Sequence, residues 1–381
     1  MTVILNVIDN PRAFWVVNSL FVFALSVFCA GVLIPQILLI SFRKRLFDVP
    51  DERKIHQGVV PRLGGVAFKP VVFFSVALAL GLNMLLGYGQ LLGNIGSESR
   101  PLAFGFCTIM MLYLVGMADD LIGIRYRAKF AIQIICGLLV IAGGLWINNL
   151  HGLLFIHALP EWIGYPITLF AVVFIINAIN LIDGIDGLAS GLCGVAMLFY
   201  GLVFFIIGEY IYALLAFATL GVLVPFFYYN VFGDPAKKNK IFMGDTGSLT
   251  IGMMTCILSL KLLDGVPVNP SMQQPNAFFL AYSPLIIPCF DVVRVYLHRV
   301  RNGKNPFLPD KNHIHHKMLA VGMRQRTVMI AIVLVSVCFT LCNILLSRYI
   351  NVTLLLILNI FIWTLGNLWL TRRIHIAHSK L

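Results

Sequence analysis

The sequence predicts an all-α integral membrane protein with about eleven transmembrane helices. The 381 residues are 59% hydrophobic and only 12% charged, and the mean hydropathy is +0.91. A bilayer core of about 30 Å needs about 20 apolar residues per helical crossing. A soluble chain of this length would carry more charge and would fold into about two domains. We therefore expect a single polytopic domain over residues 1–381.

Each span is expected where an apolar stretch lies between polar loops. The first span is interpreted as a retained helix, because it is long for a cleaved signal and its positive charges follow the apolar stretch. No internal repeat supports an inverted-repeat transporter architecture. The expected spans are Ala13–Ile40, Gly65–Leu86, Pro101–Ala118, Phe130–Ile147, Ile163–Leu181, Leu188–Ile207, Tyr210–Tyr229, Ser248–Leu263, Ala277–Leu297, Thr327–Ser347 and Ile350–Leu370.

Basic residues collect in alternate loops and predict the orientation of the chain. One set of loops holds most of them, at 43–62, 125–129, 237–240 and 294–326, whereas the other set holds only Arg12, Arg100, Lys261 and Arg348. The positive-inside rule then places the N-terminus outside and the C-terminus in the cytoplasm. The net charge of +12 fits attraction to anionic lipid and identifies no substrate.

The predicted cytoplasmic loops also carry the residues suited to chemistry. Asp119 and Asp120 end the third span. Adjacent carboxylates at a membrane boundary repel each other unless a divalent cation or a cationic side chain offsets their charge. Consecutive helical positions point about 100° apart, so we expect one carboxylate to bind metal and the other to handle a proton. The alternative is a solvated helix end capped by acids.

Asn177, Asn180, Asp183 and Asp186 recur every three residues at the end of the fifth span. On a regular α-helix such positions drift about 60° per step, so the four share a side only where the helix tightens or ends. The glycines that follow the two aspartates permit such an end. We expect a broken helix end lining a polar cavity, with oxygen atoms suited to a hard cation. Interhelical hydrogen bonding explains one asparagine easily, but not four such groups.

The next cytoplasmic loop places Asp245 between glycines just before the eighth span. This arrangement offers a carboxylate and backbone N–H groups to a phosphate and its metal. The spacing is not that of a Walker A loop. Thr246 and Ser248 have an alternative explanation as helix caps, which leaves Asp245 unexplained. An earlier pair, Gly64 and Gly65, is equally compatible with ligand approach and with helix packing.

The long loop at 298–326 is expected to recognise substrate and contains His313, His315 and His316. Three histidines in four residues suggest zinc, but the oxygen ligands elsewhere and the lack of a paired cysteine disfavour it. Hydrogen bonds to phosphate or sugar oxygens are the preferred interpretation. Asp291 and Arg294, three residues apart on the ninth span, are interpreted as an internal ion pair.

Together these loops predict phosphoryl transfer at a lipid boundary. Acids that hold Mg²⁺ and bases that hold phosphate oxygens are the recurring parts of such sites. An ion-coupled transporter is the rival from another class, but it would spread ionisable residues through the membrane depth, where these spans are nearly bare. A lipid-binding scaffold would need the lysines but not the aspartates and asparagines.

Four motifs in order resemble the polyprenyl-phosphate N-acetylhexosamine-1-phosphate transferase family, within about residues 40 to 320. The nearest branch is similar to the bacterial undecaprenyl-phosphate N-acetylglucosamine-1-phosphate transferases. The four together are more specific than any one alone. They read Asp119-Asp120, Asn177-x-x-Asn180-x-x-Asp183-x-x-Asp186-Gly187, Phe242-Met-Gly-Asp245-Thr-Gly-Ser248 and Pro309-Asp310-x-x-His313-Ile-His315-His316.

The resemblance implies transfer of a sugar-1-phosphate, first of all N-acetylglucosamine-1-phosphate, from a UDP-sugar to undecaprenyl phosphate. UMP is released and a lipid-linked glycan is begun, with Mg²⁺ as cofactor and Mn²⁺ as an alternative. The implied location is the bacterial inner membrane, with the active site facing the cytoplasm. No nucleic-acid partner is expected, and a homodimer is left open.

The resemblance also implies roles for single residues. Asp119, Asp120 and Asp245 would be catalytic, with Asp119 deprotonating or orienting the acceptor phosphate. Asp245, Asn180 and Asp119 would bind the metal. The implied substrate-binding residues are Lys129 near the phosphates, Phe242 and Asp186 at the uracil, and Asn177, Asp183, His313, His315 and His316.

The histidine motif bears on the choice of sugar. Its Pro-Asp-x-x-His-Ile-His-His form resembles the N-acetylglucosamine branch rather than the Pro-Leu-His-His-His form of the muramoyl-pentapeptide branch. The region around His56 also lacks the lysine and the Thr-Pro-Thr-Met run of that branch. UDP-MurNAc-pentapeptide is therefore disfavoured, and other UDP-N-acetylhexosamines stay open. We favour direct attack by the acceptor phosphate over an aspartyl intermediate.

Overall fold

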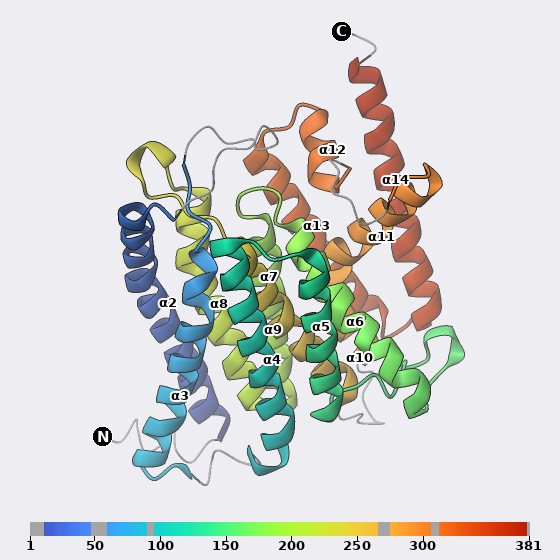
Figure 1. Cartoon of the computed structure of the whole chain (residues 1–381). Coiled ribbons are helices and arrows are strands. Elements are labelled where there is room, and N and C mark those ends of the chain that lie inside the picture. The colour runs from blue at the N-terminus through green and yellow to red at the C-terminus, as the bar shows by residue number, and fades with distance from the viewer. Residues whose placement is uncertain (1–10, 47–58, 90–94, 266–274, 306–311, 379–381) are drawn as a thin grey trace.

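The computed structural model describes residues 11–46, 59–89, 95–265, 275–305 and 312–378, and all its regular elements are helices (Figure 1). This confirms the predicted all-α class. The α-helices are α2 Pro11–Lys44, α3 Phe68–Leu85, α4 Ile95–Ile122, α5 Tyr126–Ala142, α6 Glu161–Ile182, α7 Leu188–Ile207, α8 Tyr210–Val231, α9 Gly244–Asp264, α10 Ala277–Tyr282, α11 Ile286–Arg301, α12 Ile314–Ala320, α13 Gln325–Leu346 and α14 Val352–His378.

Within the described ranges, ten helical segments are long and apolar enough to cross a membrane. The one expected span missing from these ten is the fourth, Phe130–Ile147. The structure has there the 17-residue helix α5, which ends before Gly143 and Gly144. The expected span Ala277–Leu297 is also interrupted, because a 3₁₀ turn containing Pro284 separates α10 from α11. Proline lacks the N–H that a continuing α-helix requires.

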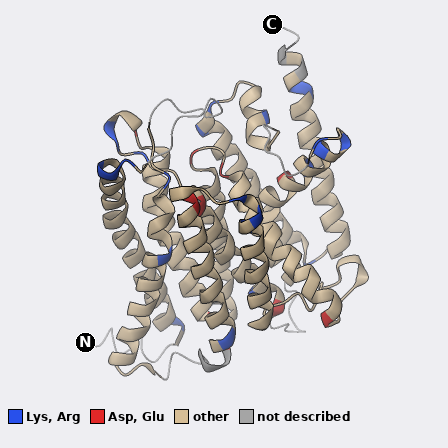
Figure 2. Ribbon diagram, in the orientation of Figure 1, with Lys and Arg blue, Asp and Glu red and all other residues tan. Residues whose placement is uncertain are grey.

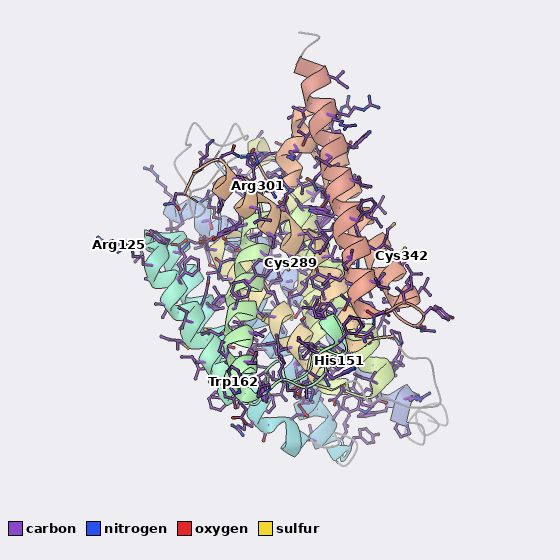
Figure 3. All side chains as sticks on the ribbon, turned by 90° about the vertical axis from the view of Figure 1, so that its right-hand side faces the viewer. Arg125, His151, Trp162, Cys289, Arg301 and Cys342 are labelled. Atoms are coloured by element: carbon purple, nitrogen blue, oxygen red, sulfur yellow. The ribbon has the colours of Figure 1, made fainter. Side chains whose placement is uncertain are left out.

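The helices run between two ends of a bundle that differ in charge. Lys and Arg gather mainly at the end where α14 finishes (Figure 2). Arg125 and Arg301 lie at this end, while His151 and Trp162 lie at the other (Figure 3). The described residues of the predicted cytoplasmic loops, such as Arg125 and Arg301, therefore lie at one end of the molecule.

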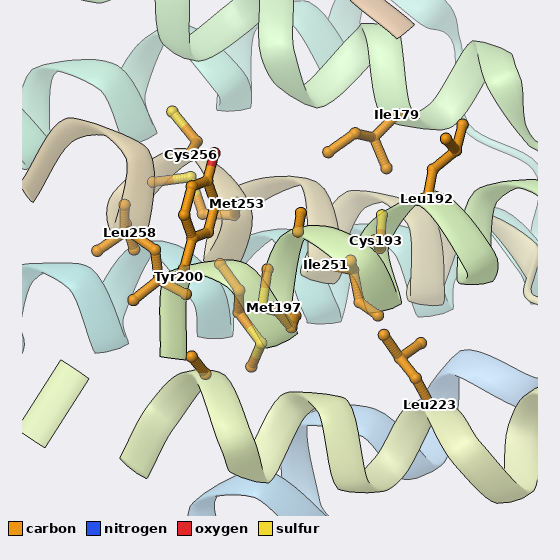
Figure 4. Close-up of a cluster of buried hydrophobic side chains, with 14 of the residues drawn as sticks. Ile179, Leu192, Cys193, Met197, Tyr200, Leu223, Ile251, Met253, Cys256 and Leu258 are labelled. Carbon is orange, nitrogen blue, oxygen red and sulfur yellow. The ribbon is translucent and has the colours of Figure 1, made fainter. Parts of the chain in front are cut away.

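Helix α9 forms the centre of the bundle. Every residue from Thr246 to Leu263 is buried. Thr250 and Thr255 donate their hydroxyls to carbonyls one turn earlier in the same helix, as Thr255 does to Ile251 O at 2.7 Å, which satisfies them without water. Around it α7 packs through apolar side chains, and the buried hydroxyl of Tyr200 donates to Ala281 O at 2.6 Å (Figure 4). The first turn of this enclosed helix carries Asp245.

Two glycines let other segments touch the start of α9. A Cβ on Gly65 would lie 2.0 Å from Gly247 N, and one on Gly116 would lie 2.6 Å from Asp245 O. Both contacts are with backbone, which cannot give way. The Gly64-Gly65 pair therefore serves helix packing, the second of its two sequence interpretations.

The opposite end of the bundle holds an ion network that the sequence did not predict. Lys261, assigned to an outer loop, is buried in the last part of α9, with Nζ 2.9 Å from Glu98 Oε1 and 3.8 Å from Glu209 Oε1. Tyr212 donates its hydroxyl to Glu98 at 2.7 Å. These contacts join α4, α8 and α9 and account for the charge of Lys261.

Candidate functional site

Asp120 holds the N-terminus of α9. Its Oδ1 accepts the backbone N–H of Asp245 at 2.8 Å. Its Oδ2 accepts the N–H of Thr246 at 2.8 Å and the Thr246 hydroxyl at 2.6 Å. A carboxylate at this place satisfies helix-end donors and complements the helix dipole. The acid at the end of α4 thus fixes the helix that carries Asp245.

Asp119, the neighbouring acid, faces a different partner. Its Oδ2 lies 2.6 Å from Lys129 Nζ, and its Oδ1 accepts the N–H of Ile124 at 2.6 Å. The same ammonium of Lys129, on α5, also pairs with Asp245 Oδ2. Three helices therefore bring two carboxylates to one cation. The adjacent aspartates thus have different partners, and their roles stay predictions.

Asn180 joins this cluster from α6. Its amide nitrogen donates to Asp245 Oδ1 at 2.9 Å and to Ser248 Oγ at 2.8 Å. Asn177, one turn earlier, donates instead to Gln133 Oε1 at 2.6 Å and to Val173 O at 2.7 Å. Asn177 thus ties α6 to α5, as the interhelical alternative expects for a single asparagine.

The helix break predicted after Ile182 is present. Helix α6 ends there, and Gly187 adopts a φ of +77° before α7 begins. Asn230 secures this turn, since its Oδ1 accepts the N–H of Gly187 at 2.7 Å while its Nδ2 donates to Ile241 O at 2.8 Å. The turn is consequently fixed relative to the segment that leads into α9.

Asp183 lies on this turn, where solvent reaches its side chain. Surrounding protein displaces much of its water, and this loss of hydration, followed by the charges of Asp245 and Asp186, raises the pKa of Asp183 to about 7. An acid that keeps its proton near neutrality marks a site where negative charge is concentrated. The cause of the shift also shows that Asp183 belongs to the same electrostatic cluster as Asp245.

Replacing Asp183 with asparagine is expected to stabilise the protein at alkaline pH. The folded state holds the Asp183 proton up to a pKa of about 7, whereas the ordinary value is 3.8. The contribution of Asp183 to the free energy of unfolding of the wild-type protein therefore falls as the pH rises from 4 to 7, and it stays low above pH 7. After discounting for solvent screening, we expect a gain of about 1 to 2 kcal/mol above pH 7 and little near pH 4. Thermal unfolding of both proteins across this range measures it, and an equal gain at every pH contradicts it.

Asp186 is held by Lys240, and Phe242 follows Lys240 by two residues in the chain. Buried Lys240 places Nζ 2.6 Å from Asp186 Oδ2. The half-buried Phe242 is held by its backbone, whose N–H donates to Pro61 O at 2.8 Å and whose carbonyl accepts from Gly64 N at 3.0 Å. The structure thus fixes both residues that the resemblance assigns to the uracil.

The histidines lie at the start of α12, and His315 contacts Gly184 in the turn at 183–187, here called the acidic turn. His313 Nδ1 lies 2.8 Å from Asp291 Oδ2. The ring of His315 is parallel to that of His313 within 10°, with centroids 5.8 Å apart, and lies 4.2 Å from that of His316. Asp291 and Arg294 do form the predicted ion pair, at 2.7 Å, but Asp291 also holds His313. Pro309 and Asp310 of this motif, and His56, lie outside the described residues.

The side-chain oxygens around the Lys129 ammonium are of the kind that bind a metal ion. Asp119 and Asp245 each reach one ammonium, so their carboxylates are close enough to share a positive ion. The side chain of Asn180 uses only its nitrogen Nδ2 in these contacts, which leaves its side-chain oxygen Oδ1 for a ligand. In the part of the chain that is described, no three His, Cys, Asp or Glu side chains group as a metal site. A metal here would therefore need an amide or phosphate oxygen as well.

Three buried residues that contact the predicted site residues were not predicted from the sequence. Gln133, Asn230 and Lys240 are buried and contact Asn177, Gly187 and Asp186 respectively. Gln133 and Asn230 are polar residues within apolar helices, and this was the available signal. Lys240 had been counted only as part of a basic loop.

Comparison with known proteins identifies the family of this chain. Residues 102–263 match the family model described as glycosyl transferase family 4. The undecaprenyl-phosphate alpha-N-acetylglucosaminyl 1-phosphate transferase of Yersinia pestis is 31% identical over 78% of this chain and 76% of that protein. A probable undecaprenyl-phosphate N-acetylglucosaminyl 1-phosphate transferase of Bacillus subtilis is 30% identical over 89% of this chain and 88% of that protein.

The undecaprenyl-phosphate alpha-N-acetylglucosaminyl 1-phosphate transferase of Escherichia coli K12 is 30% identical over 76% of this chain and 74% of that protein. These relatives confirm the resemblance found in the four motifs, and they give no support to a transporter. The chain belongs to glycosyl transferase family 4 and is a membrane-embedded sugar-phosphate transferase.

Proposed function

We propose that this protein transfers N-acetylglucosamine-1-phosphate from UDP-N-acetylglucosamine to undecaprenyl phosphate and releases UMP. The observation that carries the proposal is the pairing of Asp119 and Asp245 with the single ammonium of Lys129. Two acids and a movable cation at the charged end of a membrane bundle suit a diphosphate donor and a lipid phosphate acceptor. The names of the relatives support this pair of substrates.

We place Mg²⁺ at Asp245 and Asp119, with the carbonyl oxygen of Asn180 as a further ligand. These are hard oxygen donors of the kind that Mg²⁺ prefers, and it retains water and phosphate oxygens as additional ligands. A metal ion held there would supply positive charge to the diphosphate. Lys129 would donate its ammonium to phosphate oxygens. The pairing of the Lys129 ammonium with both carboxylates supports this role, because the side chain is long enough to reach the place of the phosphates.

In the reaction, an oxygen of the acceptor phosphate attacks the phosphorus that bears the sugar. A new P–O bond forms as the bond from that phosphorus to the UMP oxygen breaks, so UMP leaves with the bonding electrons. Asp119 orients the acceptor phosphate and takes its proton where one is present. The acceptor is already a nucleophile, so alignment is the main requirement and no covalent enzyme intermediate is needed.

The donor is held from the turn at 183–187 and from α12. We expect Asp186 and Phe242 to meet the base. His316, the least buried of the three histidines, would meet sugar and phosphate oxygens, and the buried His313 and His315 would hold it in place. We place the site on the cytoplasmic side of a bacterial inner membrane, where the positive-inside rule puts these loops. An assay of the purified protein with a panel of UDP-sugars and undecaprenyl phosphate tests the donor. Preference for another UDP-N-acetylhexosamine, or for UDP-MurNAc-pentapeptide, would overturn the sugar assignment.

Asp120 is expected to support the site by capping rather than by chemistry. Asp120→Ala leaves two N–H groups and a hydroxyl of α9 without their acceptor, which should cost about 1 to 3 kcal/mol of stability. Asp120→Asn keeps one acceptor oxygen, so it should retain more stability than Asp120→Ala. It should also retain more activity than Asp119→Asn. Thermal unfolding and kcat of the three variants measure this. An Asp120→Asn protein as inactive as Asp119→Asn but fully stable would show a chemical role instead.

A further inference from the structure

Helix α12 meets the acidic turn through a contact that requires a glycine. A Cβ on Gly184 would lie 2.3 Å from His315 Nε2 and 2.6 Å from His315 Cε1. Gly184 is not among the residues with positive φ, so the turn itself does not demand a glycine there. What demands it is the imidazole ring, which lies on the backbone of the turn.

His315 is buried, with 1% of its surface exposed, and neither ring nitrogen has a hydrogen-bond partner among the described residues. Its burial, followed by the nearby positive charges of His316 and His313, lowers the pKa of His315 to about 3. The ring is therefore neutral and packs as a flat plate. An unsatisfied buried nitrogen costs about 1 to 3 kcal/mol, so this placement is not one that packing alone favours.

The start of α12 is fixed from the other side by α11. Asp291 is fully buried and accepts from His313 Nδ1 at 2.8 Å and from the N–H of Ile314 at 3.0 Å. Arg294 pairs with Asp291 at 2.7 Å and also donates to the carbonyl oxygen of Asn312. Three consecutive residues, 312–314, are thus bound to one buried ion pair. The histidines that follow can move only if this attachment loosens.

We propose that Asp291 and Gly184 are positioning residues for the sugar-phosphate donor. Asp291 fixes where α12 begins, and Gly184 admits His315 so that α12 lies directly against the acidic turn. Neither residue needs to touch the donor; each acts through a histidine. The inference rests on the proposed function, in which α12 helps to hold the donor.

A double-mutant cycle tests the Gly184 contact. Gly184→Ala forces His315 away without straining the backbone, and should raise the KM of UDP-N-acetylglucosamine about tenfold. The KM of undecaprenyl phosphate should stay the same. In a His315→Ala background the clash no longer exists, so Gly184→Ala should change the donor KM by about twofold or less. Gly366→Ala, at a glycine with no atom within 4 Å of its Cβ position, is the matched control.

Hydrogen exchange provides a second measurement that needs no turnover. Amides of α12 should exchange faster in Gly184→Ala, and in a graded series from wild type to Asp291→Asn to Asp291→Ala. His315→Ala should abolish the effect of Gly184→Ala on exchange. Exchange effects of Gly184→Ala that are the same in both backgrounds would overturn the proposed contact.

The two measurements separate two kinds of failure. A wild-type protein inactive with every UDP-sugar would refute the proposed reaction, while the exchange cycle would still decide the contact. If the reaction holds and the exchange cycle behaves as expected, but Gly184→Ala and Asp291→Asn leave the donor KM unchanged, the positioning role is refuted. A rise in the acceptor KM equal to that of the donor would refute it as well.

Discussion

Asp245→Asn is expected to abolish UMP release, with a loss of at least about 10³-fold in kcat. Asp245 is the residue on which the site converges, since it contacts Lys129 and Asn180 through its side chain and Asp120 through its backbone. Asparagine keeps the size and the backbone contact. It removes the charge that would hold a metal and balance the ammonium. Measuring UMP release as Mg²⁺ is titrated separates a loss of metal affinity from a loss of chemistry.

The matched control is Asp264→Asn, at the opposite end of the same helix. Asp264 is exposed and accepts a hydrogen bond from Asn148 at 2.8 Å, far from Lys129. Its replacement should leave turnover unchanged. Both variants should unfold close to the wild-type temperature. Retained turnover in folded Asp245→Asn protein would contradict the metal assignment.

Lys129→Met should lower kcat by about 10² to 10³-fold. The substitution keeps the length of the side chain but leaves Asp119 and Asp245 facing each other with no cation between them. The two carboxylates then repel the phosphates of both substrates. We expect part of the binding, but not the rate, to return at high Mg²⁺, because a metal neutralises charge without replacing the ammonium. Steady-state kinetics across Mg²⁺ concentrations measure this.

Arg127→Met is the control for Lys129, two residues earlier on α5. Arg127 is exposed and its guanidinium lies over the ring of Tyr126 at 5.8 Å. It removes one positive charge from the same segment without touching the carboxylates. Equal losses in Arg127→Met and Lys129→Met would show that overall basic charge matters, and not the contact with Asp119 and Asp245.

Much of the fold was predictable because a bilayer requires long apolar helices between polar loops. Helix α7 begins and ends at the predicted residues, Leu188 and Ile207. Deviations arose where local geometry decides: Gly143 ends α5 early, and Pro284 interrupts the ninth span. Hydropathy does not record such breaks, because glycine and proline count as ordinary residues in an apolar average.

The sequence predicted which residues would cluster, but not which partner each of them contacts. Asp119 and Asp120 are adjacent in the chain, and only the packing of α4 on α9 shows that one faces Lys129 and the other caps a helix. Likewise, Asp291 was interpreted as a simple ion pair, because its contact with His313 spans 22 residues. Contacts at such separations leave no local pattern to read.

Turnover by the purified protein with both substrates present tests the proposed reaction. UMP and the lipid diphosphate sugar should form in equal amounts. Neither should form when undecaprenyl phosphate or the divalent ion is omitted, and Asp245→Asn should form neither. UMP released at the full rate without the lipid, or with Asp119 and Asp245 both replaced by asparagine, would contradict it.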